Sequence, residues 1–189
     1  MIPTRESPVS DPNANLQALP PEEDEGNAAW FRRAPWHDGV ILLGGTSLID
    51  FRFRVAQSQL RSDLTPSYWS LCGLIREDGS LRTVPFQLSD VSAVPRTNAV
   101  RTLSIDEFDD PIDWPNIAIV RFADNSAAVE RHADRVAERR SVVDLPGLLL
   151  DWLAFGWATE AAANPLLRGR GMPSAAFVEA AHALAGPRA

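Results

Sequence analysis

The feature that most constrains the fold is an Asp-Gly pair, Asp78-Gly79, which separates two segments that favour β-structure. The segment before it reads YWSLCGLIR (68–76), and the segment after it reads SLRTVPF (80–86). An Asp-Gly pair between two such segments predicts a β-hairpin. The first segment carries apolar side chains on both faces of the predicted strand, with Trp69, Leu71, Gly73 and Ile75 on one and Tyr68, Ser70, Cys72 and Leu74 on the other. Such a strand needs a packing layer on each side of its sheet.

The remaining segments predict further strands and several helices. Short continuous apolar runs over 39–43 (GVILL) and 116–122 (NIAIVRF) predict buried strands. Helices are expected over 47–63, from 104 to near 111, from 124 or 126 to 140, over 145–163 and over 174–186. Capping residues mark their starts, namely Thr46 or Ser47, Ser104, Asp124 or Ser126, Asp144 and Ser174. Together the elements predict an α+β fold with a small, mainly antiparallel sheet packed with helices.

The negative charge of the chain is concentrated at its beginning. Residues 1–29 hold one arginine against six carboxylates and almost no large apolar side chains, which predicts a disordered acidic tail. This tail is either a tether that docks to a partner or a solvated extension. Residues 30–189 then form a single domain, and their charge is nearly balanced. Without a basic field, we expect no binding to nucleic acid.

Composition also limits the cofactors and the compartment. A single cysteine, Cys72, excludes an intramolecular disulfide, and three scattered histidines favour no metal site. The glycines at 44–45 and 169–171 have the wrong spacing for a nucleotide loop, so no cofactor is expected. The first residues lack a basic patch followed by an apolar stretch, and charges at Asp151 and Glu160 interrupt the longest apolar region. We therefore expect neither a signal peptide nor a transmembrane segment, and a cytoplasmic location.

Three short motifs occur in a specific order. The stretch HDGVILL (37–43) is similar to an early strand that begins Gly-Asp-Ile, with Asp38 and Gly39 reversed. The stretch SLCGL (70–74) is similar to a strand of the form Ser-His-aliphatic-Gly-aliphatic, and SAAFV (174–178) to a helix start of the form Cys-Ser-Glu-aromatic-Val. Through them the region from about 36 to 186 resembles the circularly permuted NlpC-type branch of the papain-like hydrolases, which includes lecithin retinol acyltransferase-like proteins. The resemblance implies a permuted papain-like fold.

The sequence departs from this family at each position that carries its chemistry. Leu71 stands where the resemblance places the general-base histidine, and Ser174 stands where it places the nucleophilic cysteine. The third polar position falls at Thr83 to Pro85 and offers no carboxylate. A cysteine at a helix N-terminus is activated by the helix dipole and an imidazolium, whereas a serine needs a positioned base. Leu71 cannot serve as that base.

Three other residues are candidates for replacing the site that the resemblance implies. Cys72 follows Leu71 on the strand, so we expect it to project to the opposite face and to be a buried core residue instead of a nucleophile. Ser174 is explained as a helix N-cap, with a nucleophile as the alternative. His37 is either a surface residue at a strand end or a replacement base. Accordingly, no catalytic residue is assigned.

Two arginines precede the last helix. Arg168 and Arg170 lie in the glycine-containing loop LLRGRGMP (166–173). With the backbone amides of the helix start, their guanidiniums form a candidate site for a carboxylate or phosphate. The alternative is a loop with solvated arginines.

Together with these residues, the resemblance implies a catalytically inactive papain-like domain, a pseudoenzyme. Its degenerate cleft would bind a protein partner or a small ligand. The alternative is a hydrolase or acyltransferase of amide or ester bonds that uses Ser174 or Cys72.

Overall fold

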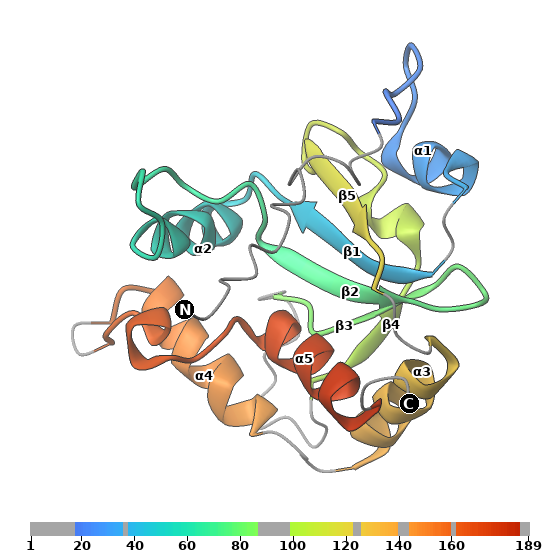
Figure 1. Ribbon diagram of the computed structural model, residues 1–189. Coiled ribbons are helices and arrows are strands. Elements are labelled where there is room, and N and C mark those ends of the chain that lie inside the picture. Colours follow the sequence, from blue (N-terminus) through green and yellow to red (C-terminus); the bar gives the residue numbers. More distant parts are fainter. Residues whose placement is uncertain are drawn as a thin grey trace, which may run out of the picture.

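The computed structural model describes residues 18–35, 38–86, 99–122, 126–139, 144–159 and 162–185. At its centre lies a five-stranded antiparallel sheet in the order β4-β3-β2-β1-β5 (Figure 1). The strands are β1 (Gly39–Gly44), β2 (Leu71–Ile75), β3 (Leu81–Thr83), β4 (Arg101–Leu103) and β5 (Asn116–Val120). With the helices around it, this sheet confirms the predicted α+β class.

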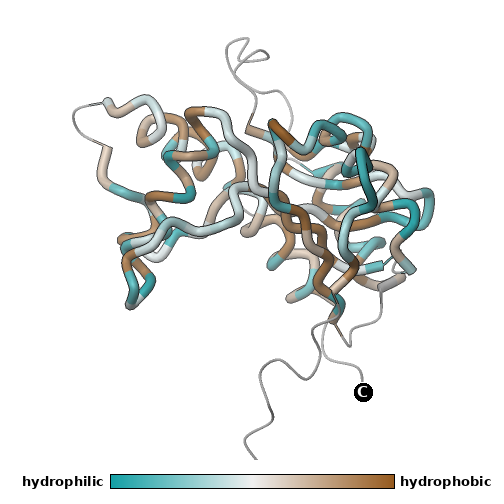
Figure 2. The backbone as a smooth tube through the Cα atoms, turned by 90° about the horizontal axis from the view of Figure 1, so that it is seen from above, coloured by the Kyte–Doolittle hydropathy of each residue, from teal (hydrophilic) through white to brown (hydrophobic). Residues whose placement is uncertain are grey.

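Helices cover both faces of the sheet (Figure 1). They are α1 (Asn27–Arg33), α2 (Leu48–Ser58), α3 (Ser126–Glu138), α4 (Leu145–Gly156) and α5 (Pro173–Ala185), with 3₁₀ helices η2 (Ile105–Phe108) and η3 (Pro165–Arg168). Helices α3 and α5 pack with one face of the sheet, and α1 and η2 pack with the other. Seen from above, hydrophobic segments run through the middle of the molecule and hydrophilic ones follow much of its edge (Figure 2).

The hairpin predicted from the Asp-Gly pair is confirmed. Strands β2 and β3 pair in antiparallel register, with Gly73 opposite Thr83. Gly79 has a φ of 77°, a left-handed conformation that glycine adopts at little cost. The carboxylate of Asp78 accepts a hydrogen bond from the backbone N–H of Ser80 at 2.9 Å, which stabilises the turn.

Strand β2 is buried on both faces, as its alternating pattern predicts. All five of its residues are buried. Cys72 and Leu74 pack with α3 and α5, whereas Leu71 and Ile75 pack in the cluster that contains α1 and η2. Because β2 lies between two helical layers, the direction of each side chain decides which layer it contacts.

The predicted boundary at residue 29 is too late. The Nδ2 group of Asn27 donates to the carbonyls of Phe108 at 2.9 Å and Trp114 at 2.8 Å. Earlier still, the carbonyl of Leu19 accepts a hydrogen bond from Trp30 Nε1 at 2.8 Å. Helix α1 was missed because it is short and its start carries no side-chain cap. The rest of the predicted tail, residues 1–17, lies outside the described residues.

Several other element boundaries differ from those predicted. The helix expected over 145–163 ends at Gly156, and Ala158 then takes a φ of 53°, which turns the chain away. The loop expected over 166–173 begins inside η3, which the side chain of Asn164 caps. Strand β4 was missed, since its three residues are too few to show a periodic pattern. By contrast, the caps at Ser47, Ser104 and Asp144 are confirmed.

Candidate functional site

The candidate site lies where the start of α5 contacts β2. The helix begins at Pro173, and the carbonyl of Met172 accepts from the backbone N–H of Ala176 at 2.8 Å. Proline is favoured at a first helical position, where its missing N–H costs nothing. Ser174 is therefore the second residue of the helix, and its interpretation as the N-cap is wrong.

The hydroxyl of Ser174 faces Cys72. Its Oγ accepts a hydrogen bond from the backbone N–H of Cys72 at 3.3 Å, and Cys72 Sγ lies 3.6 Å from the same oxygen. The two residues are 3% and 8% exposed, so the contact is sealed by protein. The prediction that Cys72 projects away from this position is wrong, because α5 packs over the face of β2 that carries Cys72 and Leu74. Leu71 points into the other layer.

Burial keeps the thiol of Cys72 protonated. Desolvation raises its pKa from 9.0 to about 11, and the hydrogen bond with Ser174 acts in the opposite direction without cancelling that effect. A thiol becomes a good nucleophile only as the thiolate. At neutral pH, Cys72 therefore behaves as a small core residue, as the sequence predicted, although it lies on the unexpected face.

Thr83, where the resemblance predicts a third polar position, is 1% exposed. Its hydroxyl donates to the carbonyl of Cys72 at 2.5 Å. Side-chain hydroxyls of Ser174 and Thr83 thus bond to both polar backbone groups of Cys72. The polar atoms of Ser174 and Thr83 therefore hold strand β2 in place at Cys72.

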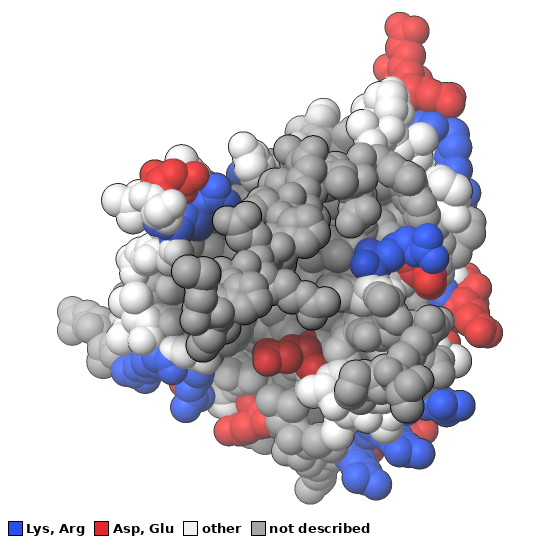
Figure 3. Space-filling view, viewed as in Figure 1, with Lys and Arg blue, Asp and Glu red and all other residues white. Residues whose placement is uncertain are grey.

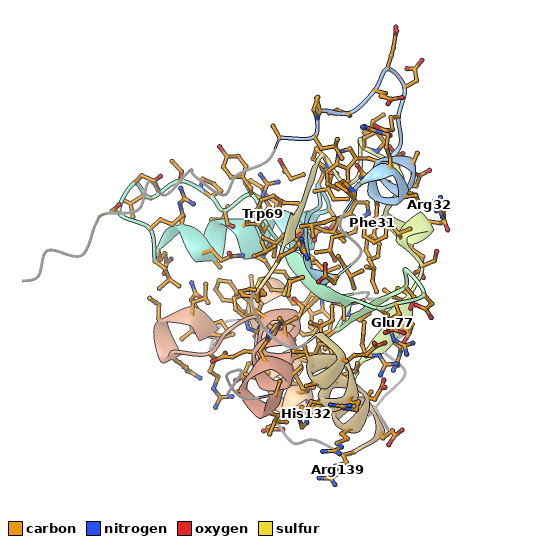
Figure 4. All side chains as sticks on the ribbon, turned by 45° about the vertical axis from the view of Figure 1, so that its right-hand side comes forward. Phe31, Arg32, Trp69, Glu77, His132 and Arg139 are labelled. Carbon is orange, nitrogen blue, oxygen red and sulfur yellow. The ribbon has the colours of Figure 1, made fainter. Side chains whose placement is uncertain are left out.

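The described histidines lie away from Ser174. His182 follows it by eight residues on α5, which is about 12 Å along the helix axis. His132 lies on α3, well below Trp69 at the entry to β2 (Figure 4). In the part of the chain that the structure describes, neither imidazole is hydrogen-bonded to Ser174. His37, the other candidate base, lies outside the described residues.

An aromatic cluster fastens the segment that leads into α5. Trp152 is fully buried, and its Nε1 donates to the carbonyl of Gly171 at 2.9 Å. The ring of Phe53 packs edge-on against those of Trp152 and Phe86, at centroid distances of 4.8 and 4.4 Å. These contacts position the segment that leads into α5. Sequence reasoning missed it, since Phe53, Phe86 and Trp152 come from segments far apart in the chain.

Gln57 of α2 adds polar contacts on the same side of the site. Its Nε2 donates to the carbonyl of Trp69 at 2.9 Å and lies 3.3 Å from the sulfur of Met172. Helix α2 thereby links the entry of β2 to the residue before α5. No local pattern predicts this role, because a glutamine on an amphipathic helix is usually solvated.

The two arginines proposed for an anion site lie near a carboxylate. Arg170 forms an ion pair with Asp151 of α4 at 2.6 Å, with both side chains more than one-third exposed. Arg168 ends η3 and lines a shallow hollow with Asp151 and Thr159. Because Asp151 already offsets the charge of Arg170, the anion site stays a prediction.

The described residues offer neither a metal cluster nor a membrane-spanning helix. They contain no group of three or more His, Cys, Asp or Glu side chains that could hold a metal ion. Among them, no helix combines the length and the apolar character needed to cross a bilayer. Charged side chains of both signs are scattered over the face drawn in Figure 3.

Comparisons of the chain with protein-family models, with curated proteins and with solved structures found no match.

Proposed function

We propose that this chain is a catalytically inactive, papain-like domain that acts as a binding or scaffolding module. The observation that carries the proposal is the buried contact between Ser174 and Cys72. A nucleophile must reach its substrate and must be activated by a neighbouring base. Here the hydroxyl accepts a backbone N–H, the thiol has a raised pKa, and both side chains are sealed from solvent.

A groove elsewhere on the molecule offers the binding surface. It measures about 1060 Å³ and runs between the segment before α1, η2 and the loop that leads into β5. Its walls combine indole rings with carboxylates, among them Trp30, Trp69, Trp114, Asp24, Asp110 and Asp113. Indole faces attract cations as well as apolar groups. The groove therefore suits a peptide segment that carries both arginine or lysine and apolar side chains.

Charge complementarity supports this partner. Glu22, Glu25 and Asp106 are already ion-paired with Arg33 or Arg32. Asp24 and Asp113 have no ion pair among the described residues, so their charges are available to a cationic partner.

The inactive state is tested with ester and amide substrates. We expect purified protein and the Ser174→Ala variant to show the same background hydrolysis of a 4-nitrophenyl ester and of an acyl-aminocoumarin amide. Hydrolysis that Ser174→Ala or Cys72→Ala abolishes would instead support the alternative, a hydrolase or acyltransferase.

The binding role is tested by titration with an arginine- and leucine-rich peptide, monitored by tryptophan fluorescence. We expect binding that weakens as salt rises, because exposed charges are screened. Asp24→Asn combined with Asp113→Asn should weaken it, while Glu179→Gln, an exposed change on α5, should not. Equal binding of the matched glutamate-rich peptide would contradict the proposed partner.

A further inference from the structure

Helix α2 carries a second apolar stripe on its outer side. Phe53 and Ala56 face inward and are buried in the core. Leu48, Phe51 and Val55 follow one another at spacings of three and four residues, and all three are exposed. A helix at the surface of a globular protein usually presents polar side chains on this side. Exposed apolar side chains that share one face are typical of a surface that another molecule covers.

Part of this stripe forms one wall of a groove between α2 and the end of α4, which lie next to each other (Figure 1). The groove measures about 410 Å³. Phe51 and Val55 line it from α2, and Phe155, Ala158 and Ala162 line it from α4 and the segment that follows. Phe51 is 51% exposed, so its ring is open to a partner. Because alanine side chains are short, a helix that enters the groove can approach this wall closely.

Hydrogen bonds hold the walls of the groove together. Nη1 of Arg52 donates to the carbonyl of Gly156, the last residue of α4, at 2.8 Å. Nδ2 of Asn164 donates to the carbonyl of Ala56 at 3.1 Å, which ties the segment after α4 to α2. The groove is therefore formed before a partner binds. A preformed surface lowers the entropy cost of association.

The charge at the groove is positive. Among the described residues that line it, only Arg52 is charged. Its side chain is half-buried and, within the described part of the chain, has no ion pair. A carboxylate from a partner would meet it where solvent screens charges less than at a fully exposed position. A second copy of this chain would instead bring another Arg52 into the interface without a carboxylate from its own groove. Charge complementarity therefore favours a different, acidic partner.

We propose that this groove binds an amphipathic helix of an acidic partner protein. The helix presents apolar side chains at i, i+3 or i+4 and i+7 to Phe51, Val55 and Phe155, and one of its carboxylates pairs with Arg52. The surface shares no lining residue with the groove proposed for a cationic peptide. The two binding events can therefore be tested separately.

Three synthetic peptides test the inference. The first is an amphipathic helix with leucines at i, i+4 and i+7 among alanines and glutamates. The second has lysine in place of each glutamate, and the third has the composition of the first with its leucines scattered. In ¹H–¹⁵N NMR titrations of the full chain, the first peptide should shift the backbone amides of residues 51–59 and 155–159. It should bind about fivefold more tightly than the lysine peptide, because an ion pair replaces a repulsion. Absence of these shifts, or equal binding of the lysine or the scattered peptide, would overturn the proposal.

Variants locate the contact. Phe51→Ser should weaken binding of the first peptide about tenfold or more, since aromatic anchors dominate such interfaces. Leu184→Ser, at a similarly exposed apolar position near the end of α5, should leave it unchanged. Arg52→Gln should bring the glutamate and lysine peptides to nearly equal affinity. Asp24→Asn combined with Asp113→Asn should have no effect on the first peptide, so failure here is distinguishable from failure of the cationic-peptide proposal. Unchanged binding in Phe51→Ser protein with a folded amide spectrum would overturn the proposal.

Two other occupants of the groove give different results. A second copy of the chain would produce a dimer in analytical ultracentrifugation that Phe51→Ser dissociates. A membrane surface would produce co-sedimentation with phosphatidylglycerol vesicles that the same variant abolishes. We expect neither result to depend on Phe51, and either dependence would overturn the assignment to an acidic helix.

Discussion

The two ends of β2, with α5 packed along them, differ in how their buried polar groups are satisfied. The end at Cys72 is called the closed end, and the end at Glu77 the open end. At the Cys72 end, the polar atoms of Ser174, Cys72 and Thr83 bond to one another and exclude water. At the Glu77 end, ion pairs surround a cavity and one donor of Arg82 is left without a partner. Serine and cysteine, at the first end, are residue types that often act in catalysis. Yet the polar group that lacks a hydrogen-bond partner lies at the second end. Residue identity alone therefore does not show whether a polar group already has its partner.

The stability of the closed end should depend most on the packing of α5 against β2. Phe177 lies fully buried on α5 in the same cluster as Cys72 and Leu74. Phe177→Ala should lower the free energy of unfolding by about 3–5 kcal/mol, through lost burial and the cavity left behind. Urea denaturation measures the loss. Glu179→Ala, an exposed change on the same helix, should stay within about 0.5 kcal/mol, and an equal effect of both would show that α5 is loosely packed.

Titration of Cys72 should make the closed end sensitive to alkali. Burial raises the pKa of the Cys72 thiol from 9.0 to about 11 on folding, so unfolding favours the thiolate. The stabilisation is fully present below pH 9 and is lost as the pH rises toward 11, by at most about 3 kcal/mol. Unfolding midpoints measured from pH 8 to 11 should fall more steeply for the natural chain than for Cys72→Ala. Parallel curves would mean that the thiol is solvated.

Loss of the Ser174 hydroxyl should have a smaller cost. Ser174→Ala leaves the buried N–H of Cys72 without its acceptor, which should destabilise the fold by about 1–3 kcal/mol. Chemical denaturation monitored by tryptophan fluorescence would measure this. Ser62→Ala, at an exposed position in the loop after α2, serves as the reference and should change little. A neutral Ser174→Ala would argue that the hydroxyl is kept for chemistry and not for structure.

The open end should tolerate a change that the closed end would not. Arg82→Lys retains a cation beside Asp134 and removes the unpaired Nε–H, so gain and loss should offset each other to within about 1 kcal/mol. Thermal unfolding is the measurement. A loss as large as that of Ser174→Ala would mean that Nε makes a structural contact.

The sequence predicted the parts of this fold that depend on local signals. The Asp-Gly hairpin and the caps at Ser104 and Asp144 all follow from neighbouring residues. Helix α1 could not be predicted, because Asn27 is held by carbonyls of Phe108 and Trp114.

The candidate site shows where local reasoning ends. Alternation along β2 predicted correctly that Leu71 and Cys72 point to opposite layers, but the layer that holds α5 depends on tertiary packing. The motif SLCGL predicted that Leu71 lies beside Ser174, whereas in the structure Cys72 lies beside it. The cavity beside Arg82 was also beyond the sequence, since its walls come from five elements.

The reactivity of Cys72 tests most directly whether the contact between Ser174 and Cys72 is closed to solvent. The protein would be treated at pH 8 with a maleimide, with and without 6 M urea, and its mass followed over time. We expect labelling in urea and almost none in the folded protein, since Cys72 is the only cysteine and lies buried with a raised pKa. Rapid labelling of the folded protein would contradict a closed contact at Cys72, because the thiol would then be open to substrate.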